Sequence, residues 1–275
     1  MWGDRVNLVI GKQSNLSNVL EQKIDNIILI SARDILANIE ILAPYKKSRI
    51  RLVFNHFRPS TQLNNIQNYT QYMQQAIVST SMILDYLSPT LIEKIIYTSS
   101  SSVYGSNRLC QESDILKPIN LHASLKISNE KIIESYSQKY NIDYTITRIF
   151  NMYGGDDKFS IISKIIDAYE NNKILTIVNN GSAIRDFIHI DNVVEAYSKL
   201  LFLKNIPIMN IGKGEGNSVQ NILQFLEQNG IYIKTNNIIR EEIKLSTADN
   251  TFLKKYIGID KFIEIESYLE ERLKL

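Results

Sequence analysis

The sequence lacks several features that membrane, secreted and nucleic-acid-binding proteins need. Among its 275 residues there is one cysteine, Cys110, which excludes an intramolecular disulfide and any multi-cysteine metal site. Its apolar runs, such as 27–30 and 95–97, are far shorter than the roughly 20 residues of a membrane span. The 31 basic residues nearly balance the 29 acidic ones, so the net charge of +2 offers no strongly positive surface to nucleic acid.

Metal ligands and targeting signals are scarce as well. The 3 histidines, His56, His122 and His189, include no pair at metal-ligand spacing, so we expect no metal site. The first ten residues lack the charged leader and long apolar core of a signal peptide. With the single cysteine, these absences predict a soluble protein of the reducing cytoplasm, with no membrane and no nucleic acid as partner.

Short β-branched runs alternate with helical patterns, which is typical of βαβ units and a parallel sheet. The predicted strands lie near 6–10, 27–30, 51–54, 94–99, 144–150, 174–178 and 208–211. The predicted helices cover 70–87, 121–139 with Asn120 as N-cap, 159–171, 191–203, 218–228 and a last one from about 262. We therefore expect an α/β fold, a Rossmann-like doubly wound parallel sheet with a smaller C-terminal α/β lobe. Residues 1–155 form the expected dinucleotide-binding domain, to which about 180–212 return, and 156–275 form mainly the substrate-binding lobe.

The first predicted strand is followed by a turn with a single glycine. A dinucleotide-binding turn needs small residues at its first, fourth and seventh positions, where the backbone approaches a pyrophosphate. Here these positions are Gly11, Ser14 and Ser17. The pattern agrees with a nucleotide-binding turn and equally with an ordinary connection from strand to helix.

Arg33 follows the second predicted strand, where an NAD-binding site usually offers an acidic side chain to the ribose hydroxyls. An arginine there can pair with the 2′-phosphate of NADP, so NADP(H) is favoured over NAD(H). The alternative interpretation is a solvated arginine in a polar loop.

The fourth predicted strand ends in a run of hydroxyl side chains, Ser99 to Ser102, before Val103, Tyr104 and Gly105. In a parallel sheet this end of a strand faces the ligand, so the hydroxyls could bond a substrate oxygen. Taken alone, the run would instead indicate a polar loop.

Further motifs follow in a fixed order. They are His122 four residues before Lys126, the segment Arg148-Ile-Phe-Asn151-Met-Tyr153-Gly154, and Arg185-Asp186-Phe187. Together with the serine run they resemble the extended short-chain dehydrogenases/reductases, specifically the NAD-dependent epimerase/dehydratase family that remodels nucleotide sugars. The resemblance covers nearly the whole chain, and it implies a nucleotide-diphosphate sugar as substrate and a homodimer.

The resemblance also implies roles for individual residues. Ser100 would bond the sugar oxygen, Lys126 the cofactor ribose, and Arg185 the nucleotide diphosphate. The expected catalytic residues are Ser100, His122 and Lys126; the cofactor-binding residues are Gly11, Ser14, Leu16, Arg33, Asn55, His56 and Lys126; and the substrate-binding residues are Ser101, Ser102, Asn151 and Arg185.

The main departure from the family is His122, which stands where the family has its catalytic tyrosine. Positions 122 and 126 share a helix face, so the imidazole would point where the phenol does. The charge of Lys126 should lower the pKa of His122. Three interpretations stay open: a working acid/base, a bystander beside another proton donor, or the mark of a chain that binds its ligand without redox turnover.

Other departures narrow the function. Ser101 and Ser102 replace the Asp-Glu pair of the family's 4,6-dehydratases, and Ala76 replaces an asparagine near the nicotinamide. We therefore expect an NAD(P)-dependent 4-keto-deoxysugar reductase or epimerase of polysaccharide biosynthesis. The alternatives are a cofactor-free nucleotide-sugar isomerase or mutase and a catalytically degenerate binding protein.

Two charged clusters are interpreted as solvated surface. The basic residues Lys46, Lys47, Arg49 and Arg51 precede and enter a predicted strand, and Glu241 with Glu242 forms an acidic pair near the C-terminal part of the chain.

Overall fold

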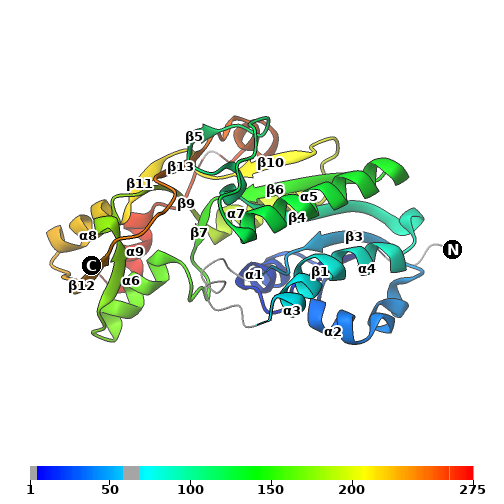
Figure 1. The fold of residues 1–275 in the computed structure, drawn as a ribbon, viewed down its shortest axis with the longest axis horizontal. Helices are drawn as coiled ribbons and strands as arrows, with labels where there is room; N and C mark the ends of the chain where they lie inside the picture. Colours follow the sequence, from blue (N-terminus) through cyan, green and yellow to red (C-terminus); the bar gives the residue numbers. More distant parts are fainter. Residues whose placement is uncertain (1–4, 58–67, 260, 275) are drawn as a thin grey trace. The chain divides into compact units, whose positions relative to one another are not determined.

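The computed structural model describes residues 5–57, 68–259 and 261–274, drawn in colour in Figure 1. The chain divides into two compact units. The first consists of 1–103, 118–148 and 197–209, and the second of 104–117, 149–196 and 210–275. The boundary expected at residue 155 therefore lies inside the second unit. The reason is that strand β7, Asn151–Tyr153, pairs with β9, Ile184–His189, which also belongs to that unit.

A six-stranded Rossmann-like sheet organises the first unit and confirms the expected fold class. Its strands are β1 Arg5–Ile10, β2 Ile27–Ile30, β3 Arg49–Phe54, β4 Ile92–Ser100, β6 Asp143–Ile149 and β10 Ile208–Ile211, in the order β2-β1-β3-β4-β6-β10. The pairs of β1 with β2 and β3, and of β3 with β4, are parallel. Every strand of this sheet was predicted from its short apolar run.

Helices α2, α4 and α5 bury their apolar residues against one face of this sheet. The helices of the unit are α1 Asn15–Lys23, α2 Ala32–Ala37, α3 Tyr69–Met73, α4 Ser79–Tyr86 and α5 Leu121–Tyr140. Ile35, Ile83 and Ile133 meet alternate strand residues such as Leu8 and Leu52 in one core, because strand side chains alternate between faces. As predicted, Asn120 caps α5, since its side chain accepts a 2.9 Å hydrogen bond from the Ala123 N–H.

The single helix expected over 70–87 is interrupted. A π-helical turn, Gln74–Val78, separates α3 from α4. The side chain of Asn129 on α5 donates a 2.6 Å hydrogen bond to the Ala76 carbonyl within this turn. A wide turn of this kind disturbs the regular helical ladder and leaves a carbonyl available to other donors, and it often marks a functional region.

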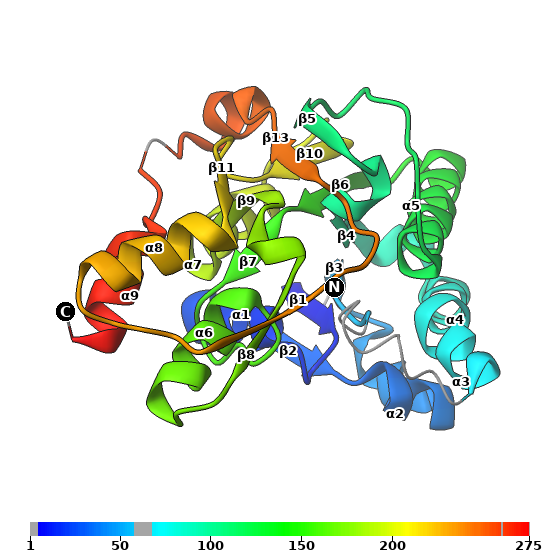
Figure 2. The same ribbon diagram turned by 60° about the vertical axis from the view of Figure 1, so that its left-hand side comes forward.

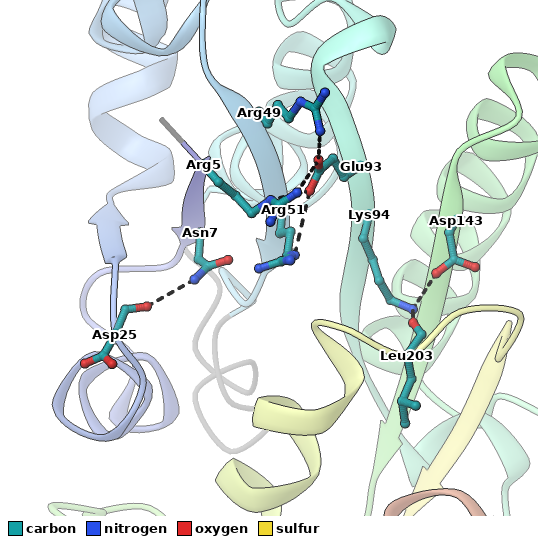
Figure 3. Close-up of polar contacts among 9 residues, drawn as sticks. All are labelled: Arg5, Asn7, Asp25, Arg49, Arg51, Glu93, Lys94, Asp143 and Leu203. Carbon is teal, nitrogen blue, oxygen red and sulfur yellow. Dashed lines mark hydrogen bonds and ion pairs between the residues drawn. The ribbon is translucent and has the colours of Figure 1, made fainter. Parts of the chain in front are cut away.

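Four charged residues meet at the start of β1, β3 and β4 (Figure 3). Arg5 pairs with Glu93 at 2.7 Å and Arg49 pairs with it at 3.4 Å. Arg51 lies 3.9 Å from the same carboxylate and stacks on the Phe202 ring. The expectation of a solvated turn is therefore wrong for Arg51, which is only 9% exposed, because β3 already begins at Arg49 and Arg51 packs between Glu93 and the Phe202 ring.

A second, mixed sheet organises the second unit, as Figure 2 shows. Its strands are β11 Gly216–Ser218, β9, β13 Leu245–Ala248 and β5 Asn107–Cys110, with β7 also paired to β9, and β8 Leu175–Val178 pairs separately with β12 Thr235–Ile238. The remaining helices are α6 Ile161–Glu170, α7 Ile190–Leu200, α8 Val219–Gln228 and α9 Ile265–Leu273. No helix in the described ranges has the length and apolarity to cross a membrane.

Candidate functional site

The glycine turn is closed by an asparagine from the next strand. Gly11 adopts φ +133°, and a Cβ on it would lie 2.1 Å from the Asn55 carbonyl oxygen. The Asn55 side chain donates hydrogen bonds of 2.8 and 2.9 Å to the hydroxyls of Ser14 and Ser17. The two serines that replace glycines in the motif therefore hold this turn together. Leu16 is 1% exposed, so only its main chain could contact a cofactor.

An open depression of about 690 Å³ lies beside this turn. Its lining residues are Lys12, Gln13, Asn18, Ser31, Arg33 and Asp34. The guanidinium of Arg33 donates a hydrogen bond to the side chain of Gln13. The expected cofactor residue Arg33 therefore borders a polar depression that carries two cationic side chains and one acidic one.

A lysine joins α5 to the end of β4. Lys126 is 5% exposed, and its Nζ donates a 2.6 Å hydrogen bond to the Thr98 carbonyl oxygen. Burial lowers the pKa of Lys126 to about 7, and the nearby carboxylate of Glu130 opposes this effect. Lys126 is thus a buried amine that gains or loses its proton near neutral pH.

One helical turn earlier on α5 lies His122, which is 7% exposed. Burial, and then the charge of Lys126, lowers the pKa of His122 to about 3, in the direction predicted from the sequence. Its buried Nδ1 has no hydrogen-bond partner among the described residues. The imidazole is therefore neutral at physiological pH, and its buried, unpaired nitrogen leaves one hydrogen-bonding position open to a ligand.

The ring of Phe57 covers both α5 side chains. It lies 4.3 Å from Lys126 Nζ and meets the His122 ring edge to face at a centroid distance of 5.7 Å. Sequence reasoning missed Phe57, although it directly follows Asn55 and His56 in the loop assigned to the cofactor.

His56, which was expected to border the cofactor, faces the π-helical turn. Its Nε2 lies 3.3 Å from the Ala76 carbonyl oxygen and 3.3 Å from the hydroxyl of Thr80. Burial, and then the charge of Lys126, lowers the pKa of His56 to about 4. His56 is therefore a second neutral imidazole, held by the π-helical turn and by helix α4 that follows it.

The serine run bends into a short 3-10 turn, Ser101–Tyr104, directly after β4. The hydroxyl of Ser100 accepts a 3.2 Å hydrogen bond from the Ser102 N–H. Ser100 is partly exposed, Ser101 is buried, and the buried hydroxyl of Ser102 has no partner among the described residues. The run is thus ordered by its own backbone at the end of the strand that also holds Lys126.

The other expected substrate residues belong to the second unit. Asn151 on β7 lies opposite Phe187 of β9, and Arg185 lies on the same strand β9. Arg185 pairs with Glu242 at 3.1 Å, and the Glu242 side chain is 20% exposed. Glu242 is therefore partly buried and paired, whereas its neighbour Glu241 is exposed as expected. The guanidinium of Arg185, which was expected to bind a diphosphate, thus already pairs with a carboxylate of this chain.

The residues of the first unit fit a dinucleotide of the NAD type in most respects. The tight approach at Gly11 and the depression beside Arg33 suit the adenosine end. The buried, unpaired Nδ1 of His122 provides a polar contact at the other end. With Phe57 at 4.3 Å from the ammonium, a ribose reaches Lys126 only when this ring moves aside.

Comparisons with known proteins relate the chain to nucleotide-sugar enzymes. Protein CapI of Staphylococcus aureus is 35% identical over 142 residues, which cover 50% of this chain and 42% of that protein. UDP-glucuronate 4-epimerase of Thermodesulfobacterium geofontis is 27% identical over 75% of this chain and 66% of its own length. The matched part of the chain therefore spans from about two fifths to two thirds of these two relatives.

Solved structures of similar proteins share the fold. UDP-glucose 4-epimerase from Thermotoga maritima, solved with UDP-glucose, has a TM-score of 0.84 at 19% identity and covers 98% of both chains. UDP-glucuronic acid 4-epimerase from Bacillus cereus, solved with UDP-glucuronic acid and NAD, has a TM-score of 0.81 at 20% identity, again over 98% of both chains. The model of the NAD dependent epimerase/dehydratase family matches residues 7–212. The chain belongs to this family, as its serine run, the segment from Arg148 to Gly154 and its Arg185 motif indicated.

Proposed function

We propose that the chain is an enzyme that epimerises or reduces the sugar of a nucleotide-diphosphate sugar, with exchange of a hydride at the sugar's C4. One observation carries this proposal: a buried amine, Lys126, and a buried imidazole with an unpaired nitrogen, His122, lie one turn apart beside the serine-rich end of β4. Such a pair at the carboxyl end of a parallel strand suits proton transfer to or from a sugar oxygen.

Each residue of the site has a defined task in this proposal. NAD, when bound, accepts or returns the hydride. Ser100 bonds the sugar oxygen, and His122 takes the hydroxyl proton on oxidation and gives it back on reduction. Lys126 binds the cofactor ribose. Because a charged Lys126 opposes an imidazolium at His122, proton acceptance becomes easier as Lys126 loses its own proton. The rate of oxidation should therefore rise with pH through about 7, the pKa of Lys126.

The cofactor in this proposal is NAD(H), in line with the family. The preference for NADP(H) stays a prediction, supported by Lys12 and Arg33 in the depression beside the glycine turn. Arg33→Ala should then weaken NADPH binding about tenfold, the effect of losing one phosphate ion pair, and leave NADH binding unchanged. Fluorescence titration with both nucleotides measures this difference.

The finer parts of the proposal concern the substrate and the assembly. A 4-keto-deoxysugar substrate and a role in polysaccharide biosynthesis are carried over from the resemblance. So are the cytoplasmic location and the homodimer. Light scattering of the purified protein tests the dimer, and a panel of UDP-linked and dTDP-linked sugars tests the substrate.

A second candidate function is supported by Phe57, whose ring lies on Lys126. In that case the chain binds a nucleotide sugar without redox turnover. A cofactor-free isomerase that uses His122 as its acid/base is the further alternative. Product formation without any bound or added nicotinamide nucleotide would favour the isomerase, and tight sugar-nucleotide binding without product would favour the binding protein.

The deciding experiment compares variants of two lysines on the same helix. Lys126→Met should lower turnover of the active sugar nucleotide by at least about a hundredfold, the usual contribution of a group that assists proton transfer. Lys131→Met is the matched control, because Lys131 is exposed and pairs with Glu134 at 2.6 Å at the surface. Turnover by Lys126→Met equal to that of Lys131→Met would contradict the proposal.

A further inference from the structure

The buried face of α5 carries one titratable side chain in each of three successive turns. His122, Lys126 and Glu130 are spaced by four residues, and their exposed fractions are 7%, 5% and 3%. Residues four apart share a helix face. The column therefore continues one turn beyond the two residues already placed in the site, and it ends in a carboxylate that the sequence did not single out.

Glu130 is held by two strands of the sheet. The hydroxyl of Ser99 on β4 donates a hydrogen bond to Glu130 Oε1. Arg148 on β6 donates from Nε to Oε1 at 3.2 Å and from Nη2 to Oε2 at 2.8 Å. Both partners of this ion pair are no more than 4% exposed. The buried carboxylate of Glu130 thus links α5 to β4 through Ser99 and, by a bidentate ion pair with Arg148, to β6.

We propose that Glu130 is a positioning residue for Lys126, which fixes the end of β4 against α5 and favours the charged form of the buried amine. Ser99, which binds Glu130, directly follows Thr98, whose carbonyl accepts the hydrogen bond of Lys126. These two hydrogen bonds therefore connect adjacent residues of β4 to successive turns of α5. This inference rests on the proposed function only in assigning Lys126 a role toward a ligand.

Stability alone does not account for a buried pair at this place. Taking a carboxylate and a guanidinium out of water costs about as much as their attraction returns, and well-packed apolar residues of the same volume often stabilise a core equally well. The carboxylate of Glu130 does lie one helical turn from an amine that burial drives toward its neutral form.

Glu130 is the one acid among the groups that act on Lys126 within the described ranges. Besides His122 on the same helix, three other residues lie near Lys126. His56 and Phe57 follow β3, and Tyr97 belongs to β4. Arg148, on β6, faces Glu130. The imidazoles are neutral, since burial lowers their pKa to about 3 and about 4, and the aromatic rings carry no charge. The carboxylate of Glu130 raises the pKa of Lys126 against the effect of burial.

The test measures the pKa of Lys126 in the protein without any ligand. Lysine labelled with ¹³C at Cε reports its protonation by NMR, and Lys126→Arg assigns the one signal that titrates near 7. In Glu130→Gln the pKa of Lys126 should fall by at least about 1, a tenfold change in the ratio of its two forms. Glu130→Asp, which keeps the charge, should restore most of this loss.

A matched control and a second variant keep the test decisive. Glu134→Gln neutralises the next carboxylate of α5, which is 30% exposed and pairs with Lys131, and it should leave the pKa of Lys126 unchanged. If Glu130→Gln does not fold because Arg148 is left unpaired, the double variant Glu130→Gln/Arg148→Gln replaces it, with a smaller expected fall because the positive charge of Arg148 is lost as well.

An unchanged pKa of Lys126 in a folded Glu130 variant overturns the inference, whatever the turnover. A lowered pKa in a protein that converts no sugar nucleotide supports the inference and contradicts the proposed function. The inference about Glu130 and the proposed function can therefore be contradicted independently of each other.

Discussion

Lys126 reaches from the first turns of α5 to the Thr98 carbonyl at the end of β4, with 2.6 Å between Nζ and the oxygen. This bond uses one of the three protons of the ammonium. The Phe57 ring covers the amine from another side at 4.3 Å. The burial of the Lys126 amine, and with it its protonation, therefore depends on Phe57, which stands 69 positions away in the sequence.

Removing the Phe57 ring should bring Lys126 closer to an ordinary lysine. Burial is the main reason why the pKa of Lys126 is about 7, so Phe57→Ala, which admits water, should raise it toward 10.4. It should also strengthen NADH binding, because the ring no longer blocks the ammonium. Phe252→Ala, which truncates a 43% exposed ring elsewhere in the chain, is the control. NMR titration and fluorescence binding check both expectations, and a lower pKa in Phe57→Ala would contradict them.

His122 should make the protein sensitive to acid. Burial first, and then Lys126, lowers the pKa of His122 to about 3 from 6.5. Between these values the unfolded chain binds a proton that the folded chain does not, so stability falls as the pH drops from about 6.5 toward 3. One such imidazole contributes up to about 1.4 kcal/mol per pH unit.

His122→Asn should therefore show a shallower loss of unfolding free energy between pH 6 and 4 than the wild-type protein, by about 1.4 kcal/mol per pH unit. Urea unfolding at several pH values measures it. Above pH 7 the two curves should run parallel. Identical slopes below pH 6 would mean that His122 is not a buried neutral imidazole.

A methyl group at Gly11 should be far more costly than the same change elsewhere. In Gly11→Ala the new Cβ would lie 2.1 Å from the Asn55 carbonyl oxygen, at φ +133°. We expect a loss of about 2–4 kcal/mol of unfolding free energy and weaker nucleotide binding. Gly230→Ala also has a positive φ, +83°, but no heavy atom within 4 Å, and should cost about 1 kcal/mol. Equal losses in the two variants would show that the approach of Asn55 is unimportant.

Neutralising Glu242 should strengthen the binding of a nucleotide diphosphate. Arg185 now pairs with this carboxylate at 3.1 Å, so a diphosphate has to compete with it for the same guanidinium. Glu242→Gln should lower the Kd for UDP several-fold, measured by calorimetry. Glu241→Gln alters the adjacent, exposed carboxylate and should leave the Kd unchanged. Weaker binding by Glu242→Gln would instead show that Glu242 itself contacts the nucleotide.

Local patterns predicted the parallel sheet well, because each of its strands contains a short apolar run and the inner strands are largely buried. They also placed His122 and Lys126 on one buried face of α5, since spacing on a helix is a local property. The second sheet was largely missed. Its strands β5, β7, β9, β11 and β13 are only three to six residues long and pair with partners that are far away in the sequence.

The contacts of the site were harder to predict than its residues. Glu242 and Arg185 are separated by 57 positions, so neither a motif nor a periodicity connects them. The packing of Phe57 on Lys126 depends in the same way on how a loop and a helix meet. Such contacts follow from tertiary structure, and their residue types alone suggested a solvated surface for Glu242 and no role for Phe57.

The π-helical turn at Gln74–Val78 has a consequence for how this protein tolerates insertions and deletions. Each residue of a helix turns the chain by about 100°. Removing one residue here would allow a regular helix from α3 into α4, with a complete hydrogen-bond ladder and a gain in local order. It would also rotate everything before the cut by about 100° and carry Tyr72 away from the Phe57 ring, which it now meets at 6.4 Å. The one surplus residue in the helix thus determines which side chains face the loop that covers Lys126.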